Sequence, residues 1–174
     1  MPDQTHFFLD RFTTPIGTLI VVADEAGKLR VIDWEEYEGR PERFLTRRGA
    51  QVAFEARPNP FGLTHALESY FTGDIQSIDK LPVAAGGTAF QQNVWQCLRS
   101  IPAGETISYG TLAERLGQPR AVRAVGLANG ANPVPIVVPC HRVIGSNGSL
   151  TGYGGGLDRK RWLLEHERRQ RSLG

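Results

Sequence analysis

A short segment near the middle of the chain divides it in two and sets the main constraint on its fold. Residues 81–87 read Leu-Pro-Val-Ala-Ala-Gly-Gly and show no hydrophobic periodicity; a proline with two glycines disfavours a continuous helix or strand. The charge balance changes sign here: residues 1–87 carry 9 Lys or Arg against 13 Asp or Glu, and residues 88–174 carry 11 against 5. We therefore predict an N-terminal domain at 1–80, a linker at 81–87 and a C-terminal domain at 88–174.

The charge difference between the two halves leaves two interpretations open. A basic second half is suited to a polyanion such as nucleic acid, which the acidic first half would repel. An ordinary solvated surface would give the same counts. Charge alone does not decide between them.

Cysteine and histidine usage bears on location and chemistry. Cys97 and Cys140 lie far apart and form no disulfide pattern, and no basic leader or 18-residue apolar run is present. We expect a reducing, cytoplasmic location and no membrane association. The four histidines lack metal-ligand spacing, so we expect neither a metal nor a cofactor.

The first half alternates strand and helix signals. Residues 18–23 and 28–34 are β-branched and apolar runs around a turn at 24–27, which predicts a hairpin. Residues 41–48 and 63–71 favour helices, and 51–55 favour a strand between them. This order predicts an α/β unit.

The second half begins with helices. Thr88 and Gln91 fit a capping box, and the apolar stripe that follows continues to Ile101, before Pro102. Ser108 can cap a helix over 109–116, and Pro119 can begin another that runs to Asn129. Two short helices joined by a glycine-containing turn indicate a helix-turn-helix.

The second of these helices is expected to be slim, because its side chains are small. Its small residues are Ala121, Ala124, Gly126, Ala128 and Gly130, and its charges are Arg120 and Arg123. The minor groove of DNA is narrower than the major groove. A slim helix could still approach the minor groove where it is widened. Close packing against another helix would also explain the alanines and glycines, so both interpretations stay open.

The segment around Cys140 carries the candidate chemistry. The apolar run 136–138 predicts a buried strand that Pro139 ends, placing the thiol at a strand end. His141 is adjacent, but neighbouring strand residues point to opposite faces, so a bridging water is the expected link between thiol and imidazole. A Cys-His dipeptide can be a nucleophile-base pair or incidental.

The remainder predicts a wing and a last helix. Residues 143–144 and 150–151 flank a turn at 145–149, which favours a hairpin, and a glycine-rich loop follows at 152–156. Asp158 can cap a final helix that ends near Arg169.

Five motifs of the second half occur together in register. They are Pro139-Cys140-His141-Arg142-Val143-Ile144, Gly104-Glu105-Thr106-Ile107-Ser108-Tyr109, Arg123-Ala124-Val125-Gly126, Asn132-Pro133 and Tyr153-Gly154-Gly155-Gly156. In these the chain resembles the O6-alkylguanine-DNA alkyltransferases. The first half resembles the bacterial constitutive type through Thr14-Pro15-Ile16-Gly17 and Trp34-Glu35-Glu36-Tyr37.

The resemblance implies an α+β fold, with a ribonuclease-H-like α/β domain followed by a winged-helix-like DNA-binding and catalytic domain. It implies that Cys140 is the nucleophile and alkyl acceptor, with His141 and Glu167 completing a proton relay through water. Asn132 would be the hinge between the DNA-binding helices and the active site. Tyr109 would hydrogen-bond the base, supply a proton and rotate the target phosphate.

The DNA contacts implied by the resemblance lie around the slim helix. Arg123 would be a finger that fills the space of a flipped nucleotide, and Ser146 would contact a phosphate at the wing. Ala121, Val122 and Gly126 would meet the minor groove or the DNA backbone. Some relatives carry a basic residue where Gly130 stands, so we expect Arg120 to supply phosphate affinity here.

The resemblance also implies a pocket for the alkylated base. Its walls would be Tyr109, Pro135, Val143, Ile144, Tyr153, Gly154 and Gly155. Because Gly155 has no side chain to crowd the site, we predict that bulky adducts such as benzyl are tolerated.

The function implied is DNA repair by direct, stoichiometric, irreversible transfer of a methyl or larger alkyl group from O6-alkylguanine, and from O4-alkylthymine, to Cys140. The expected partner is double-stranded DNA with alkylated bases, bound through the minor groove by a monomer. A thiol hydrolase using Cys140 and His141 is the alternative enzyme. A winged-helix regulator, or a damage sensor that binds without repair, is the alternative without catalysis. Cys140 argues against the sensor.

Overall fold

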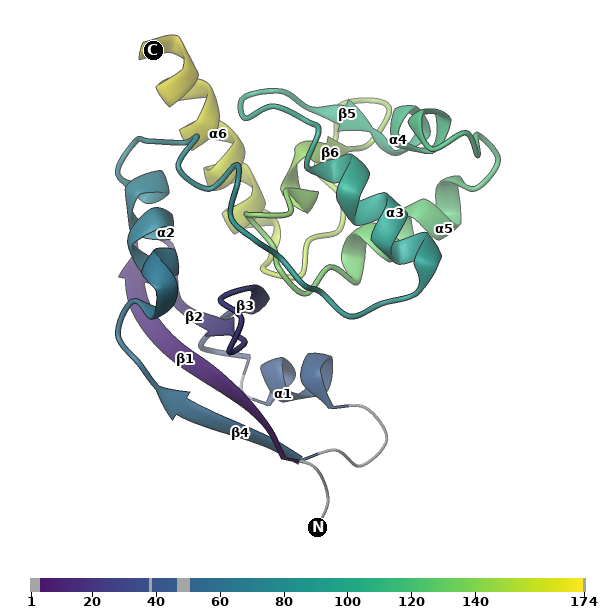
Figure 1. The fold of residues 1–174 in the computed structure, drawn as a ribbon. Coiled ribbons are helices and arrows are strands. Elements are labelled where there is room, and N and C mark those ends of the chain that lie inside the picture. Colours follow the sequence, from purple (N-terminus) through teal and green to yellow (C-terminus); the bar gives the residue numbers. More distant parts are fainter. Residues whose placement is uncertain (1–3, 38, 47–50, 174) are drawn as a thin grey trace. The chain divides into compact units, whose positions relative to one another are not determined.

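The computed structural model describes residues 4–37, 39–46 and 51–173 and has a mixed α+β fold (Figure 1). It divides into two compact units, Met1–Gly86 and Gly87–Gly174. The first unit holds a four-stranded sheet with helices, and the second holds helices around a short two-stranded pair.

The sheet of the first unit has the strand order β3-β2-β1-β4. Its strands are β1 (Gln4–Thr14), β2 (Gly17–Ala23), β3 (Leu29–Trp34) and β4 (Gln51–Ala56). β1, β2 and β3 pair antiparallel, which confirms the predicted hairpin, and β4 pairs parallel with β1. β1 was not predicted, because its apolar residues sit among His6, Asp10 and Arg11 in a weak alternation.

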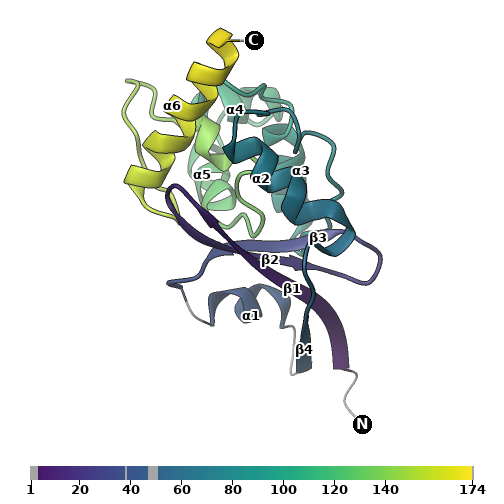
Figure 2. The ribbon, with the colours of Figure 1, turned by 90° about the vertical axis from the view of Figure 1, so that its left-hand side faces the viewer.

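Two helices accompany this sheet, with α2 above it and α1 below it in Figure 2. They are α1 (Arg40–Leu45) and α2 (Leu63–Phe71), the second preceded by a 3-10 turn, η1 (Pro60–Gly62). The predicted bounds of α2 are confirmed. α1 ends earlier than predicted, because Thr46 is extended and caps the Glu42 carbonyl; Arg47 and Arg48 lie outside the described residues. On one face of the sheet Phe7, Val22 and Val31 form a buried apolar cluster.

The second unit is mainly helical. Its elements are α3 (Ala89–Leu98), β5 (Ile107–Ser108), α4 (Tyr109–Arg115), α5 (Val122–Gly130), the 3-10 turn η2 (Cys140–Arg142), β6 (Val143–Ile144) and α6 (Leu157–Leu173). The capping box of Thr88 and Gln91 is confirmed, and the Ser108 hydroxyl caps α4 by accepting from the Thr111 N–H. α5 packs against α3 and α4.

Helix α5 begins three residues later than predicted. The Ala121 N–H donates to the Gln118 carbonyl, closing a turn in which Pro119 takes the second position. A proline favours that position as much as a first helical turn. The helix start at Pro119 was therefore wrong, and Arg120 and Ala121 precede the helix.

The segment before Cys140 is a tight turn, so the predicted strand at 136–138 was wrong. The Val137 N–H donates to the Pro135 carbonyl at 2.9 Å across Ile136, whose φ is 76°. Prolines at 135 and 139 cannot donate to a strand ladder, which explains why an apolar run turns here. A β-branched residue with positive φ is strained, and Ile136 is fully buried.

The predicted wing hairpin was also wrong in its pairing. β6 pairs in parallel with β5, with Val143 opposite Ile107, while residues 150–151 lie outside any strand. The loop is closed by a hydrogen bond from the Gly145 N–H to the Ser149 carbonyl and by another from the Gly148 N–H to the Gly145 carbonyl.

Helix α6 is longer than predicted, since it begins at Leu157 and continues to Leu173. Asp158 therefore lies within its first turn. Among the described residues, no helix combines the length and apolarity needed to cross a membrane.

Candidate active site

Cys140 is presented by two successive tight turns. Its N–H donates to the Val138 carbonyl at 2.8 Å across Pro139, and Cys140 itself begins η2. The residue is 6% exposed. The thiol thus lies at the start of a 3-10 turn, and the predicted strand end was wrong.

His141 and Glu167 form a fully buried pair. His141 Nε2 lies 2.9 Å from Glu167 Oε2, and both side chains are 0% exposed. Since the carboxylate accepts, Nε2 carries the proton and Nδ1 is left as an acceptor. Within the described part of the chain, Nδ1 of His141 is buried without a protein hydrogen bond.

Arg142 completes this pair and was missed as a site residue. Its Nε and Nη2 donate to the two oxygens of Glu167 at 2.9 and 2.8 Å, and its Nη1 donates to the Ile101 carbonyl at 2.6 Å. A bidentate guanidinium fixes the plane of a carboxylate. Arg142 therefore orients the group that orients His141. Its place inside the Cys-His-Arg motif was the available signal.

The buried network sets the charges of the relay. Burial alone would raise the pKa of Glu167, but the charge and hydrogen bonds of His141 and Arg142 outweigh it and hold that pKa well below its usual range. Burial lowers the pKa of His141, although Glu167 opposes this. Glu167 is therefore ionised at neutral pH, and burial favours the neutral form of His141.

Burial raises the pKa of the Cys140 thiol. A hydrogen bond with the Asn132 side chain and the positive charge of Lys160 act in the opposite direction. A thiol held in its protonated form needs a base to become a nucleophile.

Two asparagines connect the end of α5 with the cysteine turn. Asn132 Nδ2 donates to the Val138 carbonyl at 2.7 Å, and its Oδ1 accepts from the Val134 N–H at 2.9 Å, bracketing the tight turn. Asn129, which the sequence did not single out, donates to the Cys140 carbonyl at 3.4 Å. A movement of α5 would therefore shift the turn that holds Cys140.

Tyr109 is the first residue of α4 and lies beside α5 and the loop after β6. A Cβ placed on Gly126 would lie 3.8 Å from the Tyr109 ring, an ordinary contact distance. The Tyr109 hydroxyl donates to the Thr151 carbonyl at 3.4 Å. Tyr109 thus contacts two of the segments predicted to meet DNA and base.

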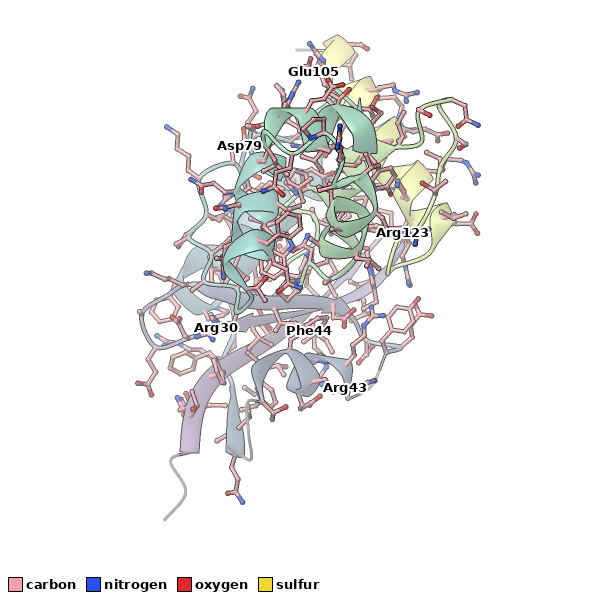
Figure 3. The ribbon with its side chains drawn as sticks, turned by 90° about the vertical axis from the view of Figure 1, so that its right-hand side faces the viewer. Arg30, Arg43, Phe44, Asp79, Glu105 and Arg123 are labelled. Atoms are coloured by element: carbon pink, nitrogen blue, oxygen red, sulfur yellow. The ribbon has the colours of Figure 1, made fainter. Side chains whose placement is uncertain are left out.

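The candidate DNA-binding residues lie on exposed or half-buried positions. Arg123 is exposed on α5, where Figure 3 labels it, and α5 carries no acidic residue. Val122 is exposed and Gly126 is half-buried on the same helix, whereas Arg120 and Ala121 occupy the preceding turn. Ser146 is exposed on the loop after β6.

The candidate pocket residues come from three segments. Val143 is buried and Ile144 half-buried in β6, while Pro135 is half-buried in the tight turn. Tyr153, Gly154 and Gly155 lie in the turn before α6, closed by the hydrogen bond from the Gly156 N–H to the Tyr153 carbonyl.

Lys160 is a second site residue that sequence reasoning missed. It is 0% exposed, and its Nζ donates to the Val143 and Thr151 carbonyls, each at 2.7 Å. The available signal was composition, because it is the single lysine among the 11 basic residues of 88–174. Among the described residues, no group of three or more His, Cys, Asp or Glu could hold a metal ion.

The chain is similar to known proteins over most of its length. Residues 89–169 match the family model of the 6-O-methylguanine DNA methyltransferase DNA-binding domain. A methylated-DNA-protein-cysteine methyltransferase of Salmonella typhimurium is 54% identical over 160 residues, covering 91% of this chain and 94% of the relative.

Solved structures agree with this similarity. The O6-methylguanine methyltransferase of Mycobacterium tuberculosis has a TM-score of 0.77 at 41% identity, covering 95% of this chain and 94% of the other. A structure of M. tuberculosis OGT in complex with DNA has a TM-score of 0.74 at the same identity and coverage. This chain belongs to the family of methylated-DNA-protein-cysteine methyltransferases.

Proposed function

We propose that this chain repairs DNA by moving an alkyl group from a damaged base onto its own Cys140. The observation that carries the proposal is the buried Cys140 turn beside the His141–Glu167 pair, inside the segment that matches the family model. DNA is the partner, in agreement with the relative solved on DNA. A thiol hydrolase is not favoured, since the relatives compared are methyltransferases.

The proposed substrates are O6-alkylguanine and O4-alkylthymine in double-stranded DNA. The product is a thioether on Cys140, which has no release chemistry in the site. Each protein molecule is therefore used once. Transfer of more than one methyl group per molecule would contradict this.

The proposed activation step moves the thiol proton of Cys140 through a water molecule to Nδ1 of His141. Nδ1 is the free acceptor of the imidazole because Nε2 is committed to Glu167. The imidazolium that forms is stabilised by the ionised carboxylate. Arg142 holds that carboxylate in place from its other side.

The proposed transfer step is an in-line displacement at the alkyl carbon. The sulfur electron pair forms the S–C bond, the C–O bond breaks, and the base leaves with that pair. Tyr109 is the proposed donor that neutralises the leaving base, and it regains its proton from solvent. The carbonyls of Cys140 and Val143 and the N–H of Gly154 are the proposed base contacts, within walls that include Pro135, Ile144, Tyr153 and Gly155.

The proposed docking mode places α5 in a widened minor groove. A base inside the duplex cannot reach a buried thiol, so the nucleotide is flipped out at a cost of a few kcal/mol. Arg123 fills the vacated space. Val122 and Gly126 on α5 and Ala121 before it approach the groove, while Arg120 and Ser146 meet phosphates; Asn132 relays the position of α5 to the cysteine turn.

We assign a ribonuclease-H-like α/β domain to 1–80, a linker to 81–87 and a winged-helix-like catalytic domain to 88–174. The chain acts as a monomer in the cytoplasm, where DNA and a reduced thiol occur together. The division of the chain into two compact units at Gly86 supports this assignment of domains.

The proposed function is tested by intact-mass measurement after incubation with a duplex containing one O6-methylguanine. We expect one methyl group per protein molecule, mapped by peptide analysis to Cys140 and absent from Cys97. Undamaged duplex is the control. A protein mass that stays unchanged with the damaged duplex, or a methyl group on another residue, would overturn the proposal.

Replacing Arg123 with alanine tests the flipping step. Arg123→Ala should slow repair of duplex DNA by about tenfold or more, since flipping costs a few kcal/mol, but should slow repair of the same lesion in single-stranded DNA much less. Single-turnover rates on the two substrates measure this. Arg161→Ala, which removes an exposed arginine on α6, is the matched control. An equal loss of rate on both substrates in Arg123→Ala would mean that Arg123 only contacts a phosphate.

A further inference from the structure

Leu127 is a strongly exposed apolar side chain on α5 that the proposed reaction does not use. It is 72% exposed, whereas Val122 at the start of the same helix is 39% exposed. A single leucine on a protein surface is ordinary and by itself indicates nothing. This leucine, however, projects from the helix that the proposed docking mode places in the minor groove, so DNA would cover it.

Leu127 and Arg123 share the outer face of α5. Residues four apart in a helix lie one turn above each other on the same face, with Cβ atoms about 5–6 Å apart. The positions beside this pair on the same face are Gly126 and Gly130, which have no side chain. Leu127 therefore stands clear of its neighbours as an apolar side chain one helical turn away from the arginine.

Packing within the chain does not explain the small residues around Leu127. A Cβ on Gly130 would meet no heavy atom of the described residues within 4 Å, apart from its own helix backbone and chain neighbours, and Ala124 is exposed. By contrast, Ala128 is 3% exposed, and its carbonyl accepts from Trp95 Nε1 at 2.8 Å. Close helix packing thus explains Ala128, while the outer face leaves room for a partner outside the chain.

The partner that this face fits is duplex DNA. α5 lies within residues 89–169, which match the DNA-binding domain model, and a relative at 41% identity is solved in complex with DNA. The helix carries Arg123 and no acidic residue, which suits a polyanion. Proteins that bind the minor groove often insert an apolar side chain such as leucine between two base pairs, which partly unstacks that step.

We propose that Leu127 is a specificity-determining residue, an apolar wedge that enters the base step beside the flipped nucleotide. Arg123 fills the space that the flipped nucleotide leaves, and Leu127, one turn further along α5, separates bases that remain in the duplex. The inference rests on the proposed function, because it assumes a flipped nucleotide in duplex DNA. The wedge contributes most where the neighbouring bases stack stiffly and least at pyrimidine–purine steps, which unstack easily.

The substitution that tests the wedge, Leu127→Ala, should leave the fold intact. The leucine side chain is 72% exposed, and alanine has the higher helix propensity. Leu173→Ala is the matched control, because Leu173 is 81% exposed at the end of α6 and has no place in the proposed docking mode. Thermal unfolding should show no loss of stability in either variant.

The first readout is the single-turnover rate of methyl transfer from O6-methylguanine at saturating protein. Leu127→Ala should be about tenfold slower on a duplex whose lesion is flanked by stiff A-tracts, the size expected when a leucine loses its burial. The loss should be smaller when pyrimidine–purine steps flank the lesion, and near zero when the lesion is in single-stranded DNA. Leu173→Ala should match the wild type on all three substrates.

The second readout is the fluorescence of 2-aminopurine placed next to the lesion, which rises when that base unstacks. Binding of the wild type to the duplex should raise it, and Leu127→Ala should raise it less at equal occupancy, measured by fluorescence anisotropy. This readout needs no methyl transfer. If wild type and Leu173→Ala transfer no methyl group, the proposed function fails, while the fluorescence still decides whether Leu127 acts as a wedge.

Three results would overturn the wedge. An equal loss of rate on all three substrates would mean that residue 127 acts on the active site through the fold. No loss on any substrate would mean that the exposed leucine has no part in repair. A fluorescence rise in Leu127→Ala equal to that of the wild type would mean that the side chain does not unstack the neighbouring base.

Discussion

Cys140→Ser should transfer no methyl group from O6-methylguanine DNA while still binding the duplex. The expected loss is complete, because a serine hydroxyl is a far weaker acid than a thiol and the His141–Glu167 relay cannot make enough alkoxide. The substitution is small, and the turn that holds residue 140 depends on backbone hydrogen bonds to Val138 and Pro139. Intact mass gives the transfer, and fluorescence anisotropy gives the binding.

Cys97→Ser is the matched control. Cys97 is half-buried on α3 and is the other free cysteine of the described chain. This variant should accept one methyl group at the wild-type rate. Transfer that persists in Cys140→Ser and disappears in Cys97→Ser would reverse the assignment of the acceptor.

Local signals in the sequence predicted most of the regular elements. Hydrophobic periodicity and caps gave the β2–β3 hairpin, β4, α2, and the starts of α3 and α4, because each depends on residues close together in the chain. β1 was missed because its stability comes from two partners, one of them β4, which begins 37 residues after β1 ends. Long-range pairing leaves little trace in a local window.

The errors at the start of α5 and in the segment before Cys140 have one physical origin. Prolines at 119, 135 and 139 have no N–H, and the same property that admits proline to a first helical turn or a strand end also favours tight turns. In the structure, each of these three prolines is part of a tight turn. The run 136–138 was correctly predicted to be buried, but burial does not distinguish a strand from a turn packed in a core.

The motif residues of the candidate site were predictable from the sequence. The residues that hold the motif residues in place were less predictable. Cys140, His141, Asn132 and Glu167 were named from the sequence, and the hydrogen bonds among these segments bring them together. The role of each remains a proposal. Arg142 and Lys160 were missed because a basic residue is ordinarily exposed, and their burial follows from contacts with Ile101 and Thr151, far away in sequence.

Glu167→Gln should lower the free energy of unfolding by about 3–5 kcal/mol at neutral pH, because it leaves Arg142 buried without its counter-ion. The exposed fractions of Arg142 and Glu167 are 4% and 0%. Repair should also slow by about 10²–10⁴-fold, since an amide neither stabilises the imidazolium nor fixes its tautomer. Urea unfolding and single-turnover kinetics, corrected for the folded fraction, measure the two effects. Glu165→Gln, at an exposed glutamate on the same helix, should change neither.

The stability difference should itself depend on pH. The folded pKa of Glu167 lies well below its ordinary value of about 4.3, so the wild type has this stabilisation in full above that value and loses it as the pH falls toward the folded pKa. The variant has no carboxyl group at residue 167 and therefore lacks this contribution at every pH. Urea unfolding at steps from pH 7 to pH 3 should therefore show the gap between wild type and Glu167→Gln narrowing below about pH 4. A gap that stays constant would mean that the charge of Glu167 does not stabilise the buried network, and that packing at residue 167 explains the loss.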